Sequence, residues 1–464
     1  MNITGRIPSV ICDLKNITLI VLSSNYLLGE FPTVLYNCSK LEILDLSQNM
    51  LVGRVPDDIH RFSRLSFLNL GQNTFFGDIP EAIGRLTTLK NLYLHQNKFN
   101  GTFPPEICNL SNLEALAMDR NKFVPSRIPV ELTRLKNLSF LSMLMTNLIG
   151  EIPESVGDMT GLQLINLSAN NLNGMIPDSL FLLKKLTHLY VYGNKLSGEI
   201  PRRIEALSLT TMDLSANNLT GTIPEDFGKL NNLTMLFMHS NQLSGKMPAS
   251  IGSRWGLKQF RLKGNSLSGE IPETIGNLMK LEMLELSHNN LSGIIPGSLF
   301  LLKNLKYLYL SDNNLSGEIP RRVEALNMVR IVLSRNNLTG TIPEEFGRLD
   351  KLTILSVHSN QFTAVRRRLP PLATAVCCCP LPPPSLPPRP AMLPEVIEGR
   401  GRGGGGGGHF FTQCRRCHLC LHSPPTALLE VEVEAEVKVL GREMTTNAVA
   451  ATSASGHLQQ CCRR

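Results

Sequence analysis

The sequence predicts an α/β repeat protein: a solenoid of about fifteen short units, with a curved parallel β-sheet on its concave face and short 3-10 or helical segments on its convex side. Two observations carry this prediction. The same apolar pattern occurs again and again, as in residues 281–296, Leu-Glu-Met-Leu-Glu-Leu-Ser-His-Asn-Asn-Leu-Ser-Gly-Ile-Ile-Pro. The proline that ends it recurs at nearly even spacing, as Pro8, Pro32, Pro56, Pro80, Pro104, Pro129, Pro153, Pro177, Pro201, Pro224, Pro248, Pro272, Pro296, Pro320 and Pro343. A bundle of helices is disfavoured, because helices do not tolerate a glycine and a proline in every unit.

The first element of each unit is a β-strand. Its Leu-x-Leu segment alternates apolar and polar residues, which is typical of a strand with one buried face. Strands of successive units are expected to pair in parallel, about 4.8 Å apart. No unit can bury its leucines alone, so the neighbouring units must cover them and stability depends on contacts between neighbours.

An asparagine follows each strand and is expected to tie the turning backbone to adjacent units. Its amide carries two donors and an acceptor, and buried backbone groups left unpaired would cost about 1–3 kcal/mol each. The unit without this asparagine has Thr146, whose single hydroxyl can satisfy fewer groups. The predicted ladder consists of Asn25, Asn49, Asn73, Asn97, Asn121, Asn170, Asn194, Asn217, Asn241, Asn265, Asn289, Asn313, Asn336 and Asn360.

Glycine, then Ile-Pro, complete the unit. Glycine allows a sharp turn. Proline fixes φ and cannot donate to a sheet, so the Ile-Pro pair is expected to direct the chain along an outer edge. The following Ile-Gly-x-Leu segment is too short for a long helix and predicts a short helical or 3-10 return.

The complete unit, L-x-x-L-x-L-x-x-N-x-L-x-G-x-I-P, resembles the plant-type leucine-rich repeat over about 360 of the 464 residues. The replacement of G-x-I-P by Pro125-Ser-Arg-Ile-Pro129, one residue longer, resembles the peptide-sensing, HAESA-like group of plant receptor kinases. Residues 167–245 and 286–363 are near-copies at an offset of 119, which indicates that five units were duplicated as a block.

Composition divides the chain into a repeat domain, residues 1–363, and a low-complexity tail, residues 364–464, which is expected to be disordered. The domain carries 34 Lys+Arg against 31 Asp+Glu and the tail 12 against 7, so the net charge of +8 lies mostly in the tail. It is no sign of nucleic-acid binding by the repeats. Cys12, Cys38 and Cys108 are the repeat domain's only cysteines, and three scattered cysteines predict no disulfide framework.

No catalytic, metal or cofactor site is expected. The kinase signatures are absent, which argues against an enzyme. In the tail, Cys-x-x-Cys-His at 414–418 matches a haem-attachment pattern and, with Cys420 and His422, could hold zinc. Either site needs ordered chain around it, so neither is expected. As written, the chain shows no signal peptide and no apolar run near the ~20 residues that span a bilayer, so no membrane insertion by this chain is expected.

The candidate ligand site lies on the outward positions of the strands from Tyr190 to Lys263. Exposed aromatic residues beside cations would supply apolar anchors and a carboxylate clamp for a peptide. The resemblance implies an Arg-x-Arg pair that captures a peptide's C-terminal carboxylate. Gln259 and Arg261 occupy these positions, so only one arginine matches, and Arg330 is a comparable half-match. The candidates are Tyr190, Tyr192, Asp213, Phe237, His239, Gln259, Arg261 and Lys263.

The resemblance implies a ligand-recognition module of a plant receptor-like protein, binding a peptide hormone or a protein for signalling in development or defence at the extracellular face of the plasma membrane, in the apoplast. A leucine-rich-repeat co-receptor kinase is the implied second partner. The alternative is a soluble interaction protein, such as an inhibitor of a pathogen's cell-wall enzyme. Glycosylation sequons agree with an extracellular protein, and the candidates outside the repeat consensus are Asn16, Asn37, Asn100, Asn109, Asn137 and Asn232.

Overall fold

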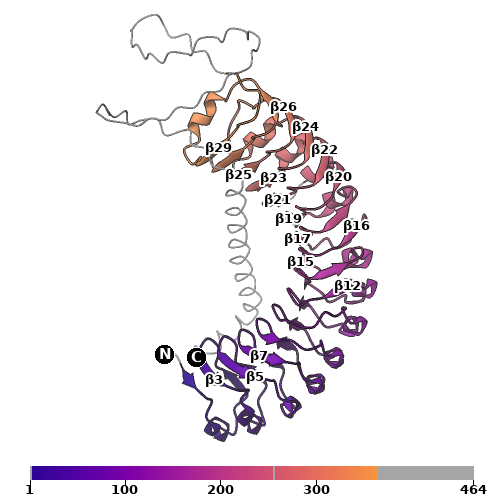
Figure 1. Ribbon diagram of the computed structural model, residues 1–464, viewed down its shortest axis with the longest axis vertical. Coiled ribbons are helices and arrows are strands. Elements are labelled where there is room, and N and C mark those ends of the chain that lie inside the picture. Colours follow the sequence, from indigo (N-terminus) through magenta and orange to yellow (C-terminus); the bar gives the residue numbers. More distant parts are fainter. Residues whose placement is uncertain (1–2, 254–255, 364–464) are drawn as a thin grey trace, which may run out of the picture. The chain divides into compact units, whose positions relative to one another are not determined.

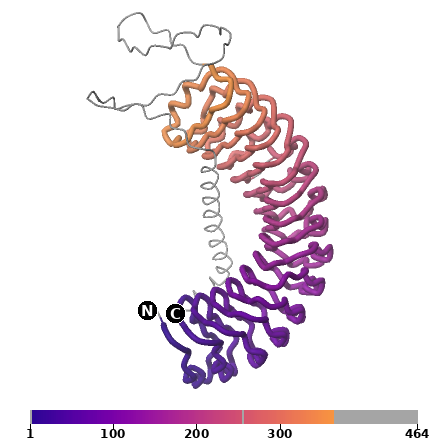
Figure 2. The backbone as a smooth tube through the Cα atoms, in the orientation of Figure 1, coloured from indigo at the N-terminus to yellow at the C-terminus, as the bar shows by residue number. Residues whose placement is uncertain are grey.

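The computed structural model describes residues 3–253 and 256–363, which all belong to one compact unit, Met1–Leu372. The predicted tail and its Cys/His motif lie outside the described residues. Successive repeats stack side by side, and the predicted solenoid is confirmed (Figure 1, Figure 2). Within the described residues, no helix combines the length and the apolar character that crossing a bilayer requires.

A fifteen-stranded parallel sheet follows the inner curve of the stack (Figure 1). One side of each strand packs on the core, and the other side forms what we call the concave face. Its strands are β2 (Leu19–Val21), β4 (Ile43–Asp45), β6 (Phe67–Asn69), β8 (Asn91–Tyr93), β10 (Ala115–Ala117), β11 (Phe140–Ser142), β13 (Leu164–Asn166), β15 (His188–Tyr190), β17 (Thr211–Asp213), β19 (Met235–Phe237), β21 (Gln259–Arg261), β23 (Met283–Glu285), β25 (Tyr307–Tyr309), β27 (Arg330–Val332) and β29 (Ile354–Ser356).

A second set of short parallel strands, which the sequence analysis did not predict, runs through the Leu-x-Gly segment of the repeats. These strands form one five-stranded sheet at each end of the stack and two pairs between them. They are β1 (Thr4–Gly5), β3 (Tyr26–Gly29), β5 (Met50–Gly53), β7 (Thr74–Gly77) and β9 (Lys98–Phe99); β12 (Ile149–Glu151) and β14 (Asn171–Asn173); β16 (Ser197–Glu199) and β18 (Asn218–Thr220); and β20 (Ser244–Lys246), β22 (Ser266–Glu270), β24 (Asn290–Ile294), β26 (Asn314–Glu318) and β28 (Asn337–Thr339).

The return segments on the opposite side from the large sheet are 3-10 helices, one of the two forms that the sequence left open, and none of the described ones is α-helical. Each of these helices begins directly after a proline, except η3, which begins at the third position after Pro56. They are η1 (Ser9–Asp13), η2 (Thr33–Asn37), η3 (Ile59–Arg61), η4 (Glu81–Arg85), η5 (Pro105–Asn109), η6 (Val130–Arg134), η7 (Glu154–Asp158), η8 (Asp178–Leu182), η9 (Glu225–Lys229), η10 (Ala249–Gly252), η11 (Glu273–Asn277), η12 (Gly297–Leu301) and η13 (Glu344–Arg348).

Leucines from all three sides of each coil form one continuous core. In the repeat that contains β23, Leu281, Leu284 and Leu286 are 0% exposed. Burial of one such side chain is worth roughly 1.5–3 kcal/mol, and here it depends on the coils above and below. The core therefore extends along the stack instead of closing into a globule.

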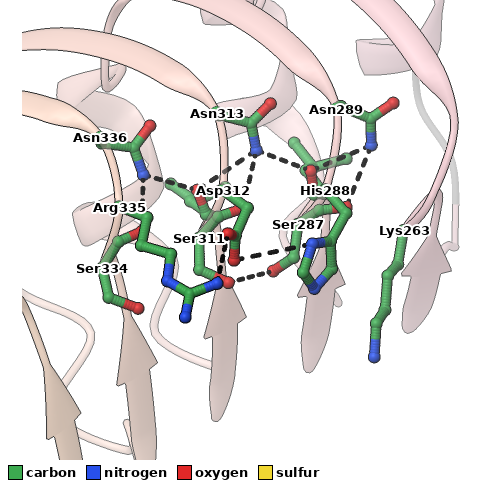
Figure 3. Close-up of polar contacts among 12 residues, drawn as sticks. Lys263, Ser287, His288, Asn289, Ser311, Asp312, Asn313, Ser334, Arg335 and Asn336 are labelled. Carbon is green, nitrogen blue, oxygen red and sulfur yellow. Dashed lines mark hydrogen bonds and ion pairs between the residues drawn. The ribbon is translucent and has the colours of Figure 1, made fainter. Parts of the chain in front are cut away.

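The ladder asparagines connect the backbones of adjacent repeats. Asn313 donates through Nδ2 to Leu310 O and Ser311 O of its own repeat at 3.2 and 3.1 Å, and to Leu286 O of the preceding repeat at 3.0 Å (Figure 3). Its Oδ1 accepts from Leu291 N at 3.0 Å. The same pattern joins Asn289 and Asn336 to their neighbours. One side chain thus satisfies backbone groups that the turn would otherwise leave unpaired.

The residue before the ladder asparagine adopts a left-handed conformation, which the sequence analysis missed. Its φ is +54° at Asp312, +55° at His288 and +51° at Ala216. Residues other than glycine adopt this region uncommonly. The hydrogen bonds of the following asparagine offset this strain, and the repeat pattern offers no fixed residue type that would signal it.

At the divergent repeat, Thr146 makes fewer connections than an asparagine. Its Oγ1 donates to Met143 O at 2.7 Å, and its backbone N donates to Asn170 Oδ1 at 2.9 Å. The next residue compensates in part, because Asn147 Nδ2 donates to Phe123 O of the preceding repeat at 2.8 Å.

Cys12 and Cys38 form a disulfide, which the sequence did not predict, because three scattered cysteines gave no sign of a disulfide framework. Their separation of 26 residues is close to one repeat period, so Cys12 in η1 and Cys38 directly after η2 lie on adjacent coils, with Cα atoms 4.7 Å apart. Stacking, and not sequence proximity, brings the two thiols together. The bond fastens the first coil to the second at the N-terminal end of the stack.

Asn313→Ala should lower the free energy of unfolding by about 2–3 kcal/mol, because carbonyl groups in two repeats lose their donor. Urea denaturation followed by circular dichroism measures the loss. Asn304→Ala is the matched control, since this exposed asparagine makes one bond, to Met279 O, and should change stability by less than about 0.5 kcal/mol. Equal losses in the two variants would contradict the role assigned to the ladder.

Replacing both Cys12 and Cys38 with alanine should destabilise the first two repeats by about 3 kcal/mol, because the disulfide no longer restricts the unfolded chain. Hydrogen exchange should show faster exchange in β2 and β4 and unchanged exchange in β25, because each repeat contacts only its neighbours. Cys108→Ala, which breaks no disulfide, is the control. Unchanged protection in β2 would show that the disulfide does not hold this end.

Candidate functional site

The parallel register places the candidate side chains in one row across the concave face. Tyr190 pairs with Asp213, Asp213 with Phe237, Phe237 with Arg261, and Arg261 with Glu285. Neighbouring strands lie about 4.8 Å apart, so side chains at paired positions are in contact range. Five strands, β15, β17, β19, β21 and β23, therefore contribute one continuous patch.

The side chains of Asp213 and Phe237 are more deeply buried than the sequence predicts. They are only 4% and 5% exposed, whereas the sequence analysis placed both on an exposed face. Larger neighbours cover them, as the Arg261 guanidinium does over Phe237, with Cζ 4.9 Å from the ring centroid. They form the floor of the patch.

Burial changes the charge of Asp213. Desolvation raises the pKa of this carboxyl to about 6, against hydrogen bonds from Ser215 N and Ser215 Oγ, at 3.0 and 2.5 Å, and the positive charge of Arg261. Asp119, on the same face, shows the same effect: burial raises its pKa to about 6 although Ser142 Oγ and Leu144 N donate to it. Asp119 was not among the candidates predicted from the sequence, because an outward position in the repeat pattern does not reveal that a side chain is buried.

Arg261 is held by its own neighbours. Its Nη2 donates to Gln259 Oε1 at 3.0 Å, so the residue at the expected position of a second arginine orients the first. Its Nε is buried and has no hydrogen-bond partner among the described residues.

Lys263 and His239 complete the patch. Lys263 Nζ lies 3.8 Å from Glu285 Oε1, and Glu285 is a residue that the sequence analysis did not single out, although it occupies the outward position of the next strand. Burial, together with the charges of Arg261 and Lys263, lowers the pKa of His239 to about 4. His239 is therefore neutral at pH 5–7, and the cations of the patch are Arg261 and Lys263.

Aromatic side chains occupy the end of the patch that is nearer the N-terminus. Tyr190 and Tyr192 are half-buried, and the rings of His188 and Tyr190 stack with centroids 6.1 Å apart. Burial is the main cause that raises the pKa of Tyr192, and the nearby carboxylate of Asp213 raises it further. Aromatic and cationic groups thus lie at opposite ends of a partly buried row.

The six asparagines proposed as glycosylation sites are all exposed. Their side-chain amides differ in surroundings, since Asn137 Nδ2 donates to Ser111 O and Asn232 Nδ2 donates to Leu207 O. Across residues 3–253 and 256–363, no cluster of His, Cys, Asp and Glu is suited to a metal ion.

Family models for the leucine-rich repeat match six stretches of the chain, described as "Leucine rich repeat" at residues 15–75, 143–196 and 256–315 and "Leucine Rich Repeat" at residues 88–110, 208–230 and 327–349. No curated protein sequence matches the chain.

Solved structures with the same fold include plant receptors. The peptide hormone receptor RGFR1 in complex with RGF2 is 32% identical, with a TM-score of 0.66, over 78% of this chain and 62% of the receptor chain. The ectodomain of the Arabidopsis receptor kinase HAESA, bound to an extended IDA peptide, is 30% identical, with a TM-score of 0.61, over 77% and 69%.

Two further structures show the range of this fold. HAESA in complex with IDA and the co-receptor SERK1 is 27% identical, with a TM-score of 0.52, over 77% of this chain and 81% of that chain. A Leptospira interrogans leucine-rich-repeat protein is 29% identical, with a TM-score of 0.62, over 78% and 90%. This chain spans about three fifths of the length of RGFR1 in its structure.

Asp213→Asn should change the slope of the free energy of unfolding against pH. The Asp213 carboxyl, whose folded pKa is about 6 against about 3.9 unfolded, binds more protons in the folded state between these values, so its contribution to stability falls as pH rises from 4 to 7. Asp119 and His239 titrate in both proteins, so the stability of the wild type relative to the variant isolates this contribution, and it should fall by on the order of 1–3 kcal/mol over this range. Urea denaturation at pH 4, 5, 6 and 7 measures both slopes, and identical slopes would refute the assignment.

Proposed function

The chain belongs to the leucine-rich-repeat family, and from this we propose that it recognises a peptide or protein ligand on its concave face as the binding module of a plant receptor-like protein. One observation carries the proposal: the patch that includes the row from Tyr190 to Glu285 combines aromatic side chains with two cations, Arg261 and Lys263, on one partly buried surface. Such a surface offers apolar anchors and groups that bind carboxylates. Plant receptors with bound peptides share the fold at about 30% identity.

Arg261 is the proposed contact for the ligand's terminal carboxylate. Gln259 fixes its guanidinium over Phe237, which lowers the entropy lost on binding. With His239 neutral, the net charge of the floor depends on Asp213, which loses its proton as pH rises above about 6. Carboxylate binding at Arg261 should therefore be stronger at pH 5 than at pH 7.

An extracellular location and a co-receptor complete the proposal. The Cys12–Cys38 disulfide supports an oxidising compartment, because disulfides are rare in reducing cytosol. HAESA assembles with the co-receptor SERK1 in a solved complex, and a kinase of that type would be the corresponding partner for this chain.

The test is a binding screen against an array of random dodecapeptides with free C-terminal carboxyl groups. For peptides that bind, Arg261→Ala should weaken the affinity tenfold or more and leave the amidated forms of the same peptides unaffected. Arg134→Ala, an exposed arginine in η6 on the opposite side from the large sheet, is the control and should change the affinity less than twofold. Equal losses for acid and amide peptides would exclude the carboxylate contact, and a screen without binders would count against peptide recognition itself.

A further inference from the structure

The row of 3-10 helices is interrupted at two places. Where most repeats have the return helix, residues 201–209 and 320–328 have none, and the adjoining helices are η8 and η9 in one case and η12 and η13 in the other. Both repeats carry Arg-Arg-Ile/Val-Glu-Ala-Leu after the proline, and both are one residue shorter than the repeats beside them.

The preceding repeat explains each gap. Six of the thirteen helices in the described residues have glycine at their fourth position, and at Gly276, for example, an added Cβ would lie 2.2 Å from Ser298 Cβ of the next helix. Phe300 replaces this glycine before the second gap, and its fully buried ring stacks on Phe346, with centroids 5.9 Å apart. The shortened segment then lies extended, and both Glu324 N and Ala325 N donate to Phe300 O.

The second gap, which we call the C-terminal notch, is an open cavity of about 920 Å³ with four cationic and two acidic side chains. The sides come from three repeats, and Leu326, 42% exposed, forms an apolar part of the surface. The charged lining residues are Lys303, Arg321, Arg322, Glu324, Glu345 and Arg348.

Two of these cations are available to a ligand. Arg321 pairs with Glu318 at 3.4 Å and Arg322 with Glu324 at 2.6 Å. Lys303 and Arg348, both exposed, form no ion pair with any residue that the structure describes.

The duplication supplies an internal comparison. At the first gap, Lys184, Asp226 and Lys229 stand 119 positions before Lys303, Glu345 and Arg348. There, Lys229 Nζ lies 2.8 Å from Asp226 Oδ1, and Lys184 Nζ lies 3.9 Å from Glu205 Oε2. The two cations at the first gap thus form ion pairs within the chain, whereas the equivalent cations at the second gap form none with the described residues.

We propose that the C-terminal notch binds an acidic peptide segment of a partner protein, at a site separate from the concave face. Guanidinium groups match carboxylates in geometry, and an exposed leucine between cations suits a segment in which apolar and acidic side chains alternate. Glu345 would repel a compact dianion such as phosphate, whereas an extended peptide can pass it and offer a backbone N–H.

The probe is a fluorescein-labelled peptide of four Glu-Leu repeats, added to the full chain in 50 mM salt, where screening is weak. Fluorescence anisotropy should show binding, and Lys303→Ala with Arg348→Ala should weaken it at least fivefold. The matched pair Lys184→Ala with Lys229→Ala removes the same charges at the first gap and should change it less than twofold. Unchanged thermal unfolding verifies that both variants fold.

A second variant keeps the net charge. Glu345→Asp with Arg348→Lys recreates the Asp–Lys pair of the first gap and should weaken binding severalfold by closing the notch. Equal losses from the two alanine pairs, binding of a Gln-Leu peptide as tight as that of Glu-Leu, or displacement of the probe by millimolar inorganic phosphate would each overturn the proposal. Loss of binding on Arg261→Ala would also overturn it, because it would place the probe on the concave face.

Discussion

Every described coil of the solenoid is held in place by hydrogen bonds of the asparagine ladder. Each coil must reverse direction sharply while its backbone is buried between neighbours, and each reversal exposes carbonyl groups that no sheet can satisfy. One amide per coil donates to its own turn and to the preceding coil, and accepts from that coil's backbone, as Asn313 does. This arrangement fixes the position of each coil relative to the preceding one along the stack, and therefore the register of the large sheet.

Register in turn creates the concave site. Because each strand is aligned with the next, residues one repeat apart in sequence become neighbours in space, and Asp213, Phe237 and Arg261 form a row. Packing within the row then decides which side chains face solvent. Arg261 covers Phe237, Asp213 becomes buried, and the pKa of His239 is lowered by burial and by the cations beside it. The electrostatics of the site come from this packing and not from composition.

The opposite face follows a different rule. Helices stack closely where glycine leaves room, and a phenylalanine at that position ends the stacking for one repeat. The buried phenylalanine ring keeps the core filled, so the solenoid continues without a break although one surface helix is missing. Duplication placed the same phenylalanine and the same gap at two positions. The two copies differ by small side-chain changes, such as Asp226 against Glu345, and the cations form ion pairs at the first gap but line the cavity without such pairs at the second.

The repeat number, the parallel strands, the short returns and the positions of the ladder asparagines could all be predicted from the sequence, because these depend on a local pattern that recurs along the chain. Tertiary structure alone decided the Cys12–Cys38 disulfide, the burial of Asp213 and Phe237, and the second set of strands through the Leu-x-Gly segments. Each of these depends on contacts between successive coils, whose contacting residues lie about one repeat period apart in sequence. A periodic pattern indicates which residues occupy equivalent positions. The side chain in the neighbouring coil then decides whether the residue at a position is buried, ionised or hydrogen-bonded.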